Sequence, residues 1–213
     1  MRHHISLLLI LLACCLSVKG QEPEAFRVDT LSNAVFSRMA GKSYPEGCTV
    51  ARSDLRLLSV LHYDADGHTR QGQLVCNKAI APDLLDIFRR LYEARYPIER
   101  MTLIDDYDAD DERSMTDNNT SCFCFRQVAG SKRLSRHALG MAVDINPLYN
   151  PCVRKTKGKT VVQPAAGKRY ANRSKPSPYM LKRGDLCHRL FMEHGFKWGG
   201  DWNSLKDYQH FER

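Results

Sequence analysis

The sequence lacks any segment that could comfortably span a membrane, and only one apolar run stands out among its 213 residues. Ile5 through Val18 is almost wholly apolar, but it is shorter than the hydrocarbon core of a bilayer requires. The run follows the weakly basic start Met1-Arg2-His3-His4 and ends at Gly20, ahead of polar residues. This order is typical of a secretory signal peptide. We therefore expect residues 1–20 to be removed and the mature chain to be exported, either to a periplasm or to the extracellular space.

A lipid anchor is the alternative interpretation of the same run. Leu11-Leu12-Ala13-Cys14 resembles a bacterial lipoprotein box. Lipidation at Cys14 would anchor the chain to a membrane instead of releasing it. In either case the mature chain would contain no transmembrane helix, and we expect it to be a monomer.

Residues 153–175 lack acidic side chains altogether, although they contain eight lysines or arginines. They also lack the aromatic ladder that single-stranded nucleic acids stack on, so no nucleic-acid partner is expected. Glycines and a proline predict a loop here. The whole chain is basic as well, since its net charge of +8 becomes +6 when Arg2 and Lys19 leave with the signal peptide. An anionic partner and an ordinary solvated surface both remain open.

A glycine is missing from the one stretch that resembles a calcium loop. Residues 105–112 contain six acidic side chains, and Asp106-x-Asp108-x-Asp110 has the spacing of calcium ligands. The sixth position of such a loop requires glycine for its turn, and this sequence has Asp111 there. We therefore expect a solvated acidic loop near the rim of a functional site, and whether this loop binds an ion stays open.

Two of the eight cysteines, Cys14 and Cys15, would leave with the signal peptide. The even number that remains permits disulfides in an exported chain, with fifteen possible full pairings: Cys48, Cys76, Cys122, Cys124, Cys152 and Cys187. The sequence does not choose among them. A cysteine zinc cluster is disfavoured because Cys122-Phe123-Cys124 is tighter than the usual Cys-x2-Cys spacing.

The mature chain has the length of one domain with a substantial core. Residues 21–47 are interpreted as a lead-in segment that packs on a domain formed by residues 48–213. A short helix in the lead-in would begin at a cap on Asp29 or Thr30 and end at Gly41.

The domain itself shows both hairpin and helix patterns. Residues 53–80 predict a β-hairpin around Asp66-Gly67, a favourable turn pair. Pro82-Asp83 would open a helix that ends before Pro97, and a second helix is predicted from Gly184 to His194.

Two stretches near the end of the chain alternate at a period of two. Residues 141–146 switch between larger apolar and small or polar side chains, which predicts a strand with one buried face. Asp144 would project from the other face, toward a cleft. Residues 208–212 alternate in the same way, so a neighbouring strand could bring His210 beside Asp144.

His137, Asp144 and His210 are therefore candidate ligands of one zinc ion. Zinc accepts imidazole nitrogen and carboxylate oxygen, and three protein ligands leave a fourth position for water. Gly140 would permit the turn that brings His137 next to Asp144. Asp207 is the candidate base that would accept the proton of the attacking water.

Two motifs in this order resemble those of a known family. The first is Ser135-x-His137-x-x-Gly140-x-Ala142-x-Asp144, and the second is Trp198-Gly199-Gly200-Asp201-Trp202 followed by Asp207-x-x-His210-Phe211-Glu212. Together they are similar to the D-alanyl-D-alanine carboxypeptidase (VanY-like) family of zinc peptidases, which also includes L-alanyl-D-glutamate endopeptidases. The resemblance covers roughly residues 45 to 213, and two agreeing motifs are stronger evidence than one.

The resemblance implies roles for several residues. In that family the positions of His137, Asp144 and His210 bind zinc, and the position of Asp207 holds the catalytic carboxylate, which is Glu in some relatives. Arg126 would bind substrate or stabilise the oxyanion, and Ser135 would contact substrate or support the ligands. Trp202 would lie beside the substrate groove.

The resemblance also implies a fold and a substrate. The expected fold is α+β, with a small antiparallel sheet that carries the zinc site and helices packed around it. The expected substrate is the stem peptide of bacterial peptidoglycan. Attraction of such acidic wall peptides is one of the two roles left open for the basic segment, beside that of a solvated surface. The Hedgehog signalling domain has a similar fold and zinc yet works by binding partners. A catalytically inactive zinc-containing domain that binds the cell wall or serves as a scaffold is therefore the alternative, and the presence of Asp207 favours the enzyme.

Overall fold

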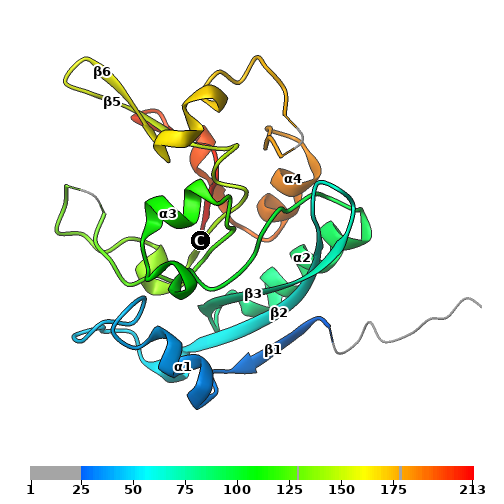
Figure 1. Ribbon diagram of the computed structural model, residues 1–213, viewed down its shortest axis with the longest axis vertical. Helices are drawn as coiled ribbons and strands as arrows, with labels where there is room; N and C mark the ends of the chain where they lie inside the picture. Colours follow the sequence, from blue (N-terminus) through cyan, green and yellow to red (C-terminus); the bar gives the residue numbers. More distant parts are fainter. Residues whose placement is uncertain (1–24, 129, 178) are drawn as a thin grey trace, which may run out of the picture.

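The computed structural model describes residues 25–128, 130–177 and 179–213 (Figure 1). The predicted signal peptide and the alternative lipid site at Cys14 lie outside these residues. Among the described helices, none has both the length and the apolar character needed to cross a bilayer. Short helices combine with small antiparallel sheets, so the predicted α+β class is confirmed.

The first sheet has the strand order β1-β2-β3 and is built on the predicted hairpin. Strands β2 (Leu55–Tyr63) and β3 (Thr69–Asn77) pair antiparallel along their full length. The turn between them contains Gly67 at φ 78°, a left-handed conformation that glycine adopts without strain. Strand β1 (Arg27–Thr30) pairs with the other edge of β2, so the lead-in segment is part of this sheet.

Helix α1 (Asn33–Met39) starts later than the sequence pattern indicated. Its cap is Ser32, whose Oγ accepts the N–H of Val35 at 3.2 Å. The predicted cap at Asp29 or Thr30 is wrong because both residues belong to β1. Pairing with β2 uses their backbone groups in a sheet, and only the serine that follows is free to begin a helix.

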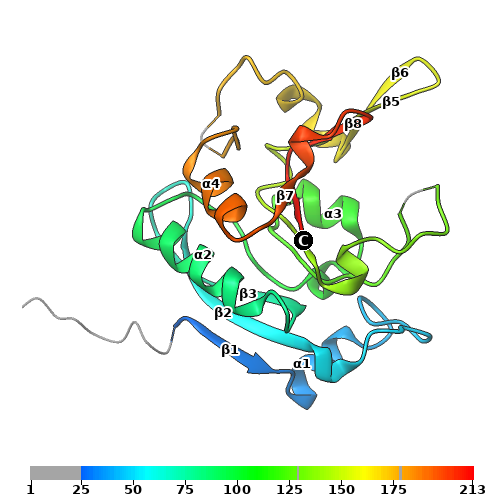
Figure 2. The same cartoon turned by 180° about the vertical axis from the view of Figure 1, so that it is seen from behind.

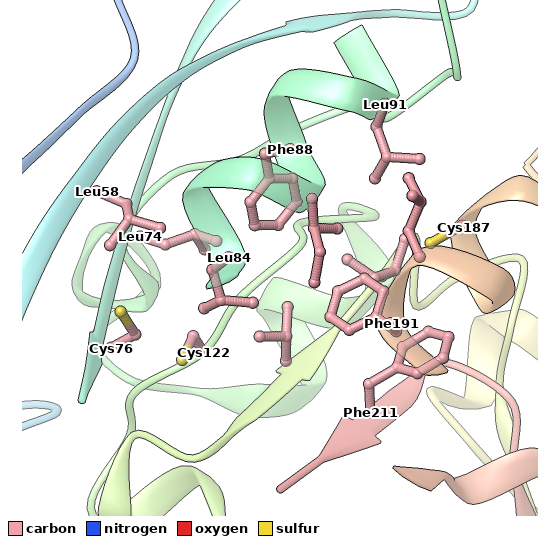
Figure 3. Packing of buried hydrophobic residues seen from close by; sticks show 14 of the residues in the cluster. Leu58, Leu74, Cys76, Leu84, Phe88, Leu91, Cys122, Cys187, Phe191 and Phe211 are labelled. Carbon is pink, nitrogen blue, oxygen red and sulfur yellow. The ribbon is translucent and has the colours of Figure 1, made fainter. Parts of the chain in front are cut away.

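Two helices and the last strand enclose the main hydrophobic core (Figure 3). Helix α2 (Ala81–Glu93) packs on β2, and helix α4 (Leu186–Glu193) packs on α2, as the apolar spacing of both predicted. Figure 3 shows side chains of both helices turned toward Phe211. The ring of Phe191 stacks on that of Phe211 with centroids 4.2 Å apart and an interplanar angle of 14°. The core thus extends directly under the carboxyl-terminal strand.

The second sheet has the order β4-β9-β7 and lies in the middle of the molecule, where both views place the carboxyl terminus (Figures 1 and 2). Strand β9 (His210–Glu212) runs between β4 (Ala142–Asp144) and β7 (Lys197–Trp198). The register pairs Asp144 directly with His210. The expected exposed face of β4 is absent, because all three of its residues are buried.

The third sheet was not predicted. It has the order β6-β5-β8, with β5 (Cys152–Thr156) and β6 (Lys159–Gln163) forming a hairpin and β8 (Leu205–Asp207) pairing with β5. The hairpin projects from the body of the molecule (Figure 1). Its turn residues, Lys157 and Gly158, have φ angles of 50° and 76°. Positive φ at both positions matches the twist of a two-residue hairpin.

The loop expected for residues 153–175 is therefore wrong. Gly158 forms the turn of the hairpin, Pro164 directly precedes the 3-10 helix η4 (Ala165–Tyr170), and Gly167 lies within that helix. The remaining short elements are η1 (Arg52–Asp54), η2 (Ile104–Tyr107), α3 (Asp111–Thr116), η3 (His137–Leu139) and η5 (Gly199–Asp201).

The acidic stretch is also more ordered than a solvated loop. Asp105 is buried and accepts the backbone N–H of Ser43 at 3.1 Å. Asp110 caps α3, because its Oδ1 accepts the N–H of Arg113 at 3.1 Å. The backbone of the segment forms η2 and the start of α3, so several of these acids serve the fold. The six cysteines that remain after residue 20 are all free thiols in this structure.

Candidate metal site and catalytic carboxylate

Three short elements bring His137, Asp144 and His210 together. His137 lies on η3, which ends at Gly140 with φ 65°. A Cβ at Gly140 would lie 2.7 Å from the backbone nitrogen of Asn77, so this turn has room only for glycine. Asp144 and His210 face each other because the β4–β9 register pairs them. The convergence that the sequence predicted for these three residues is present.

The distances between the three side chains suit a tetrahedral ion. His137 Nε2 lies 3.1 Å from His210 Nδ1 and 3.3 Å from an oxygen of Asp144, and His210 Nδ1 lies 3.0 Å from the other oxygen. Zinc–ligand bonds of about 2.0–2.1 Å with tetrahedral angles place ligand atoms about 3.3 Å apart. All three residues are buried, with exposures of 4%, 6% and 6%. The group is therefore one that could hold a metal ion.

Outer hydrogen bonds determine which nitrogen of each imidazole faces inward. The carbonyl of Cys122 lies 2.7 Å from His137 Nδ1 and can only accept, so Nδ1 carries the proton and Nε2 presents a lone pair. A carboxylate oxygen of Glu212 lies 3.1 Å from His210 Nε2, which leaves a lone pair on Nδ1.

With those tautomers, three buried acceptors face one another. Neither neutral imidazole has a proton to donate inward, and a carboxylate also only accepts. Such a cluster is unfavourable in a site of low dielectric unless a proton or a metal cation sits between the atoms. The donor set, two imidazoles and a carboxylate, is one that zinc prefers, so the residues present fit that metal.

The charges around the three residues also favour a cation between them. Burial alone would lower the pKa of His210, but hydrogen bonds to Asp144 and Glu212 and the charge of the nearby carboxylates raise it to about 10. Burial would raise the pKa of Asp144, yet the charge and hydrogen bond of His137 and the hydrogen bond of His210 hold it well below its usual range. The site therefore binds positive charge strongly.

Asp207 stands at the end of β8, on the third sheet, next to this group. Burial raises the pKa of its carboxyl to about 6, against the opposing effect of His210. Its Oδ1 atom is buried and makes no hydrogen bond within the described structure. A buried carboxyl with a pKa near neutrality and a free oxygen has the properties of a proton acceptor.

Gly199 allows the second and third sheets to meet at this point. A Cβ at Gly199 would lie 2.7 Å from the carbonyl oxygen and 2.8 Å from the Cβ of Asp207, and 3.3 Å from the Cβ of His210. Any side chain on η5 here would push Asp207 away from His210. The glycine thus sets the separation between the candidate base and the candidate ligands.

Arg126 is held close to the group of His137, Asp144 and His210 by an acid to which the sequence assigned no role at this site. Its Nε lies 2.5 Å from a carboxylate oxygen of Asp111, the first residue of α3. Burial raises the pKa of Asp111 while the charge of Arg126 opposes this, and charges on His137 and Asp144 act on it too. Asp111 was expected in a solvated loop, and it instead orients the arginine beside the ligands.

Ser135 and Trp202 flank the same group in different ways. Ser135 is buried, and its Oγ accepts the N–H of His137 at 3.2 Å, so it supports η3. Trp202 is partly exposed, with its ring 5.2 Å from the ring of His210. The roles of both residues in substrate binding stay predictions. Trp198 is buried and donates its Nε1–H to the carbonyl of Tyr208 at 2.9 Å, as part of the core.

Two other places in the described structure are weaker candidates. Asp64, Asp66 and His68 also lie close enough to share an ion, but two of the three are exposed. Asp64 already accepts the backbone N–H groups of the other two and pairs with Arg70 at 2.9 Å, which explains its position in the hairpin turn. A hollow of about 700 Å³ beside β2 and β3 has Arg27 as its only ionisable lining residue.

The sequence assigned no supporting role to three residues that have one in the structure: Asp111, Gly199 and Glu212. Glu212 could have been found, since a residue two positions after His210 on a strand lies on the same face. The other two depend on contacts between segments far apart in the chain, which the local pattern does not report.

Comparison with known proteins supports the expected family. A family model described as D-alanyl-D-alanine carboxypeptidase matches residues 129–213, which include every residue of the two motifs. This match covers less than half of the chain and confirms the resemblance over that part. Neither the curated proteins nor the solved structures gave a match.

We expect the purified chain to bind one zinc ion, and His210→Gln to weaken zinc binding by at least about tenfold, because even a partner of a ligand contributes that much. His194→Gln is the matched control, since His194 is held by Asp83 and Asp86 at 2.9 and 3.0 Å, away from the group. Metal content by mass spectrometry and a competitive zinc titration measure the effect. Equal zinc loss in both variants would contradict the ligand assignment.

The metal-free chain should lose stability as the pH rises. The pKa of His210 is about 10 in the fold against about 6.5 in the unfolded chain. The stabilisation from its proton is therefore complete below pH 6.5 and disappears as the pH rises through 10. Thermal unfolding in a chelator should show this slope. Zinc or His210→Gln should remove it, whereas a slope unchanged in His210→Gln would show that another group is responsible.

Proposed function

We propose that the chain, whose residues 129–213 match the D-alanyl-D-alanine carboxypeptidase family model, is a zinc-dependent peptidase of bacterial peptidoglycan stem peptides. The bond cut would be the one before a terminal D-alanine, or the L-alanyl-D-glutamate bond. The observation that carries the proposal is the set of three buried acceptor atoms on His137, Asp144 and His210, which a zinc ion would satisfy.

Bound zinc would supply a water of lowered pKa and would polarise the scissile carbonyl. Around it, each residue has a separate task. His137 and His210 would present nitrogen atoms whose direction is set by the Cys122 carbonyl and by Glu212. Asp144 would contribute the one negative charge of the ligand set, and its burial would keep that charge directed at the cation.

Asp207 would take the proton of the attacking water and return it to the leaving amine. Its pKa of about 6 places it in the ionised form at neutral pH, yet leaves it basic enough to accept a proton. To accept a proton, the carboxylate also needs an oxygen that is not already hydrogen-bonded, and Oδ1 of Asp207 meets this requirement.

Arg126 would bind the carboxylate end of a substrate or stabilise charge on the carbonyl oxygen, since a guanidinium presents a fork of donors. Asp111 would fix the direction of that fork through the ion pair at Nε. Trp202 would border the bound peptide next to His210.

Asp207→Asn should lower kcat by about 10²- to 10⁴-fold, the usual contribution of a general base, while zinc content stays the same. Wild-type activity should fall as the pH drops through about 6, because a protonated Asp207 cannot accept a proton. Asp66→Asn, at an exposed position of the β2–β3 turn, is the control.

Mass spectrometry of digested muropeptides would measure this activity and separate loss of D-alanine from cleavage after L-alanine. Full zinc loading without any released fragment, and identical behaviour of Asp207→Asn, would instead favour a catalytically inactive wall-binding or scaffold domain.

Export is part of the proposal, because peptidoglycan lies outside the cytoplasmic membrane. It is supported by the apolar run and polar boundary within residues 1–20. We expect the mature chain to begin after Gly20. The mass of the chain recovered from a bacterial host would show this cleavage, and a lipid-modified chain starting at Cys14 would contradict it.

A further inference from the structure

The third sheet carries one continuous face that begins at the candidate base. Residues paired across strands share a face, and the face recurs every second residue. Asp207 and Gln163 both pair with Cys152, which makes the first row. The next row on the same face has Arg154 at its centre, and the last row pairs Thr156 with Lys159. Arg154 and Lys159 therefore follow Asp207 in order toward the tip of the hairpin.

The hairpin end of this face is positively charged, and Asp207 at the other end is the acid among its paired rows. Within the described residues, neither Arg154 nor Lys159 forms an ion pair, and Lys159 is exposed. The sequence from residue 145 to residue 184 contains no aspartate or glutamate. Asp207 is the single acid on β8, at the opposite end of the face. An incoming ligand would meet cations over the hairpin and the candidate base at its foot.

The spacing of the rows fits an extended peptide. Rows two residues apart lie about 7 Å from each other along a strand, and an extended peptide repeats its side chains at the same interval. A peptide bound with its scissile bond near Asp207 could therefore place carboxylates beside Arg154 and Lys159. The guanidinium of Arg154 has a donor geometry that matches a carboxylate, and Lys159 adds a mobile point charge.

We propose that this face is the surface that selects acidic peptides, with Arg154 and Lys159 binding substrate carboxylates about two and four residues from the bond that is cut. The inference rests on the proposed peptidase function and names the chemistry of its substrate. The proposal gives the projecting hairpin a function in substrate binding. Neither the metal-binding group nor Arg126 accounts for the presence of that hairpin.

The opposite face of the same hairpin provides a matched control. Lys155 alternates with Arg154 on β5, so it points to the other side, and Lys157 lies in the turn. The double variants Arg154→Gln/Lys159→Gln and Lys155→Gln/Lys157→Gln each remove two positive charges from the hairpin. They remove the same charge from different positions: the face shared with Asp207 in the first variant, and the opposite face and the turn in the second.

The test compares two synthetic stem-type peptides, one with free side-chain carboxylates and one with those groups amidated. For the free acid, Arg154→Gln/Lys159→Gln should raise KM about 3- to 10-fold, since each exposed ion pair contributes up to about fivefold. The kcat should stay the same because neither residue touches the reacting atoms. The Lys155→Gln/Lys157→Gln variant should leave KM unchanged, and salt should reduce the difference between the variants.

Amidation should raise KM of the wild-type chain by a similar factor and abolish the effect of Arg154→Gln/Lys159→Gln. Equal KM values for the two peptides, or equal effects of the two double variants, would overturn the proposal. The second result would mean that only net charge matters.

A binding measurement separates this proposal from the proposed function. Calorimetry with zinc-loaded Asp207→Asn, which should bind without cutting, reports affinity for each peptide directly. Preferential binding of the free acid that depends on Arg154 and Lys159, in a chain that cuts neither peptide, would retain the surface and reject the enzyme. If the chain cut both peptides and bound them with equal affinity, the enzyme would be retained and the selective surface rejected. Zinc content of every variant verifies that it is folded.

Discussion

Three lone pairs that face one another in a buried site set the main constraint on this structure. His137, Asp144 and His210 point acceptor atoms at a common centre, where water cannot compensate for their repulsion. The arrangement is stable only with positive charge at that centre, and the neighbouring elements are arranged to preserve it. The Cys122 carbonyl and Glu212 each engage the outer nitrogen of one imidazole, so neither ring can turn its proton inward without losing a hydrogen bond.

The core beneath the site keeps the ligands in register. On β9, Phe211 lies between His210 and Glu212 and points the opposite way, into the stack with Phe191. Val143 does the same beside Asp144 on β4, and both apolar side chains are fully buried. A slip of one residue would turn these groups out of the core and turn the ligands into it, at a cost of about 1.5–3 kcal/mol for each large apolar side chain that loses its packing. Apolar burial on one face of the ladder thus fixes the ligand geometry on the other.

Local patterns were sufficient for the parts of the molecule whose periodicity is simple. The β2–β3 hairpin, α2 and α4 follow from periods of 2 or 3.6 and from a few turn residues. The convergence of His137, Asp144 and His210 was predicted from strand alternation together with the two motifs of the family resemblance. The third sheet was missed because its strands are short and rich in lysine, and because β5 pairs with β8 only after a separation of some fifty residues in the chain. Asp111 was misjudged for the same reason: its charged neighbours suggest solvent, whereas its partner Arg126 comes from a distant segment.

The candidate base and the candidate ligands belong to different sheets, and this division has a consequence for catalysis. Asp207 lies on β8, which pairs with β5, while Asp144 and His210 lie on the paired strands β4 and β9. The two sheets approach each other at Gly199, where there is no space for a single extra carbon atom between it and Asp207. The position of Asp207 relative to the candidate ligands therefore depends on packing between the two sheets. Its position relative to the basic hairpin depends on one continuous ladder, that of β5, β6 and β8. In the proposed binding mode, a peptide lying along that ladder would reach Asp207 at its foot, and only the approach of the two sheets would then set the distance from the peptide to His210 and Asp144.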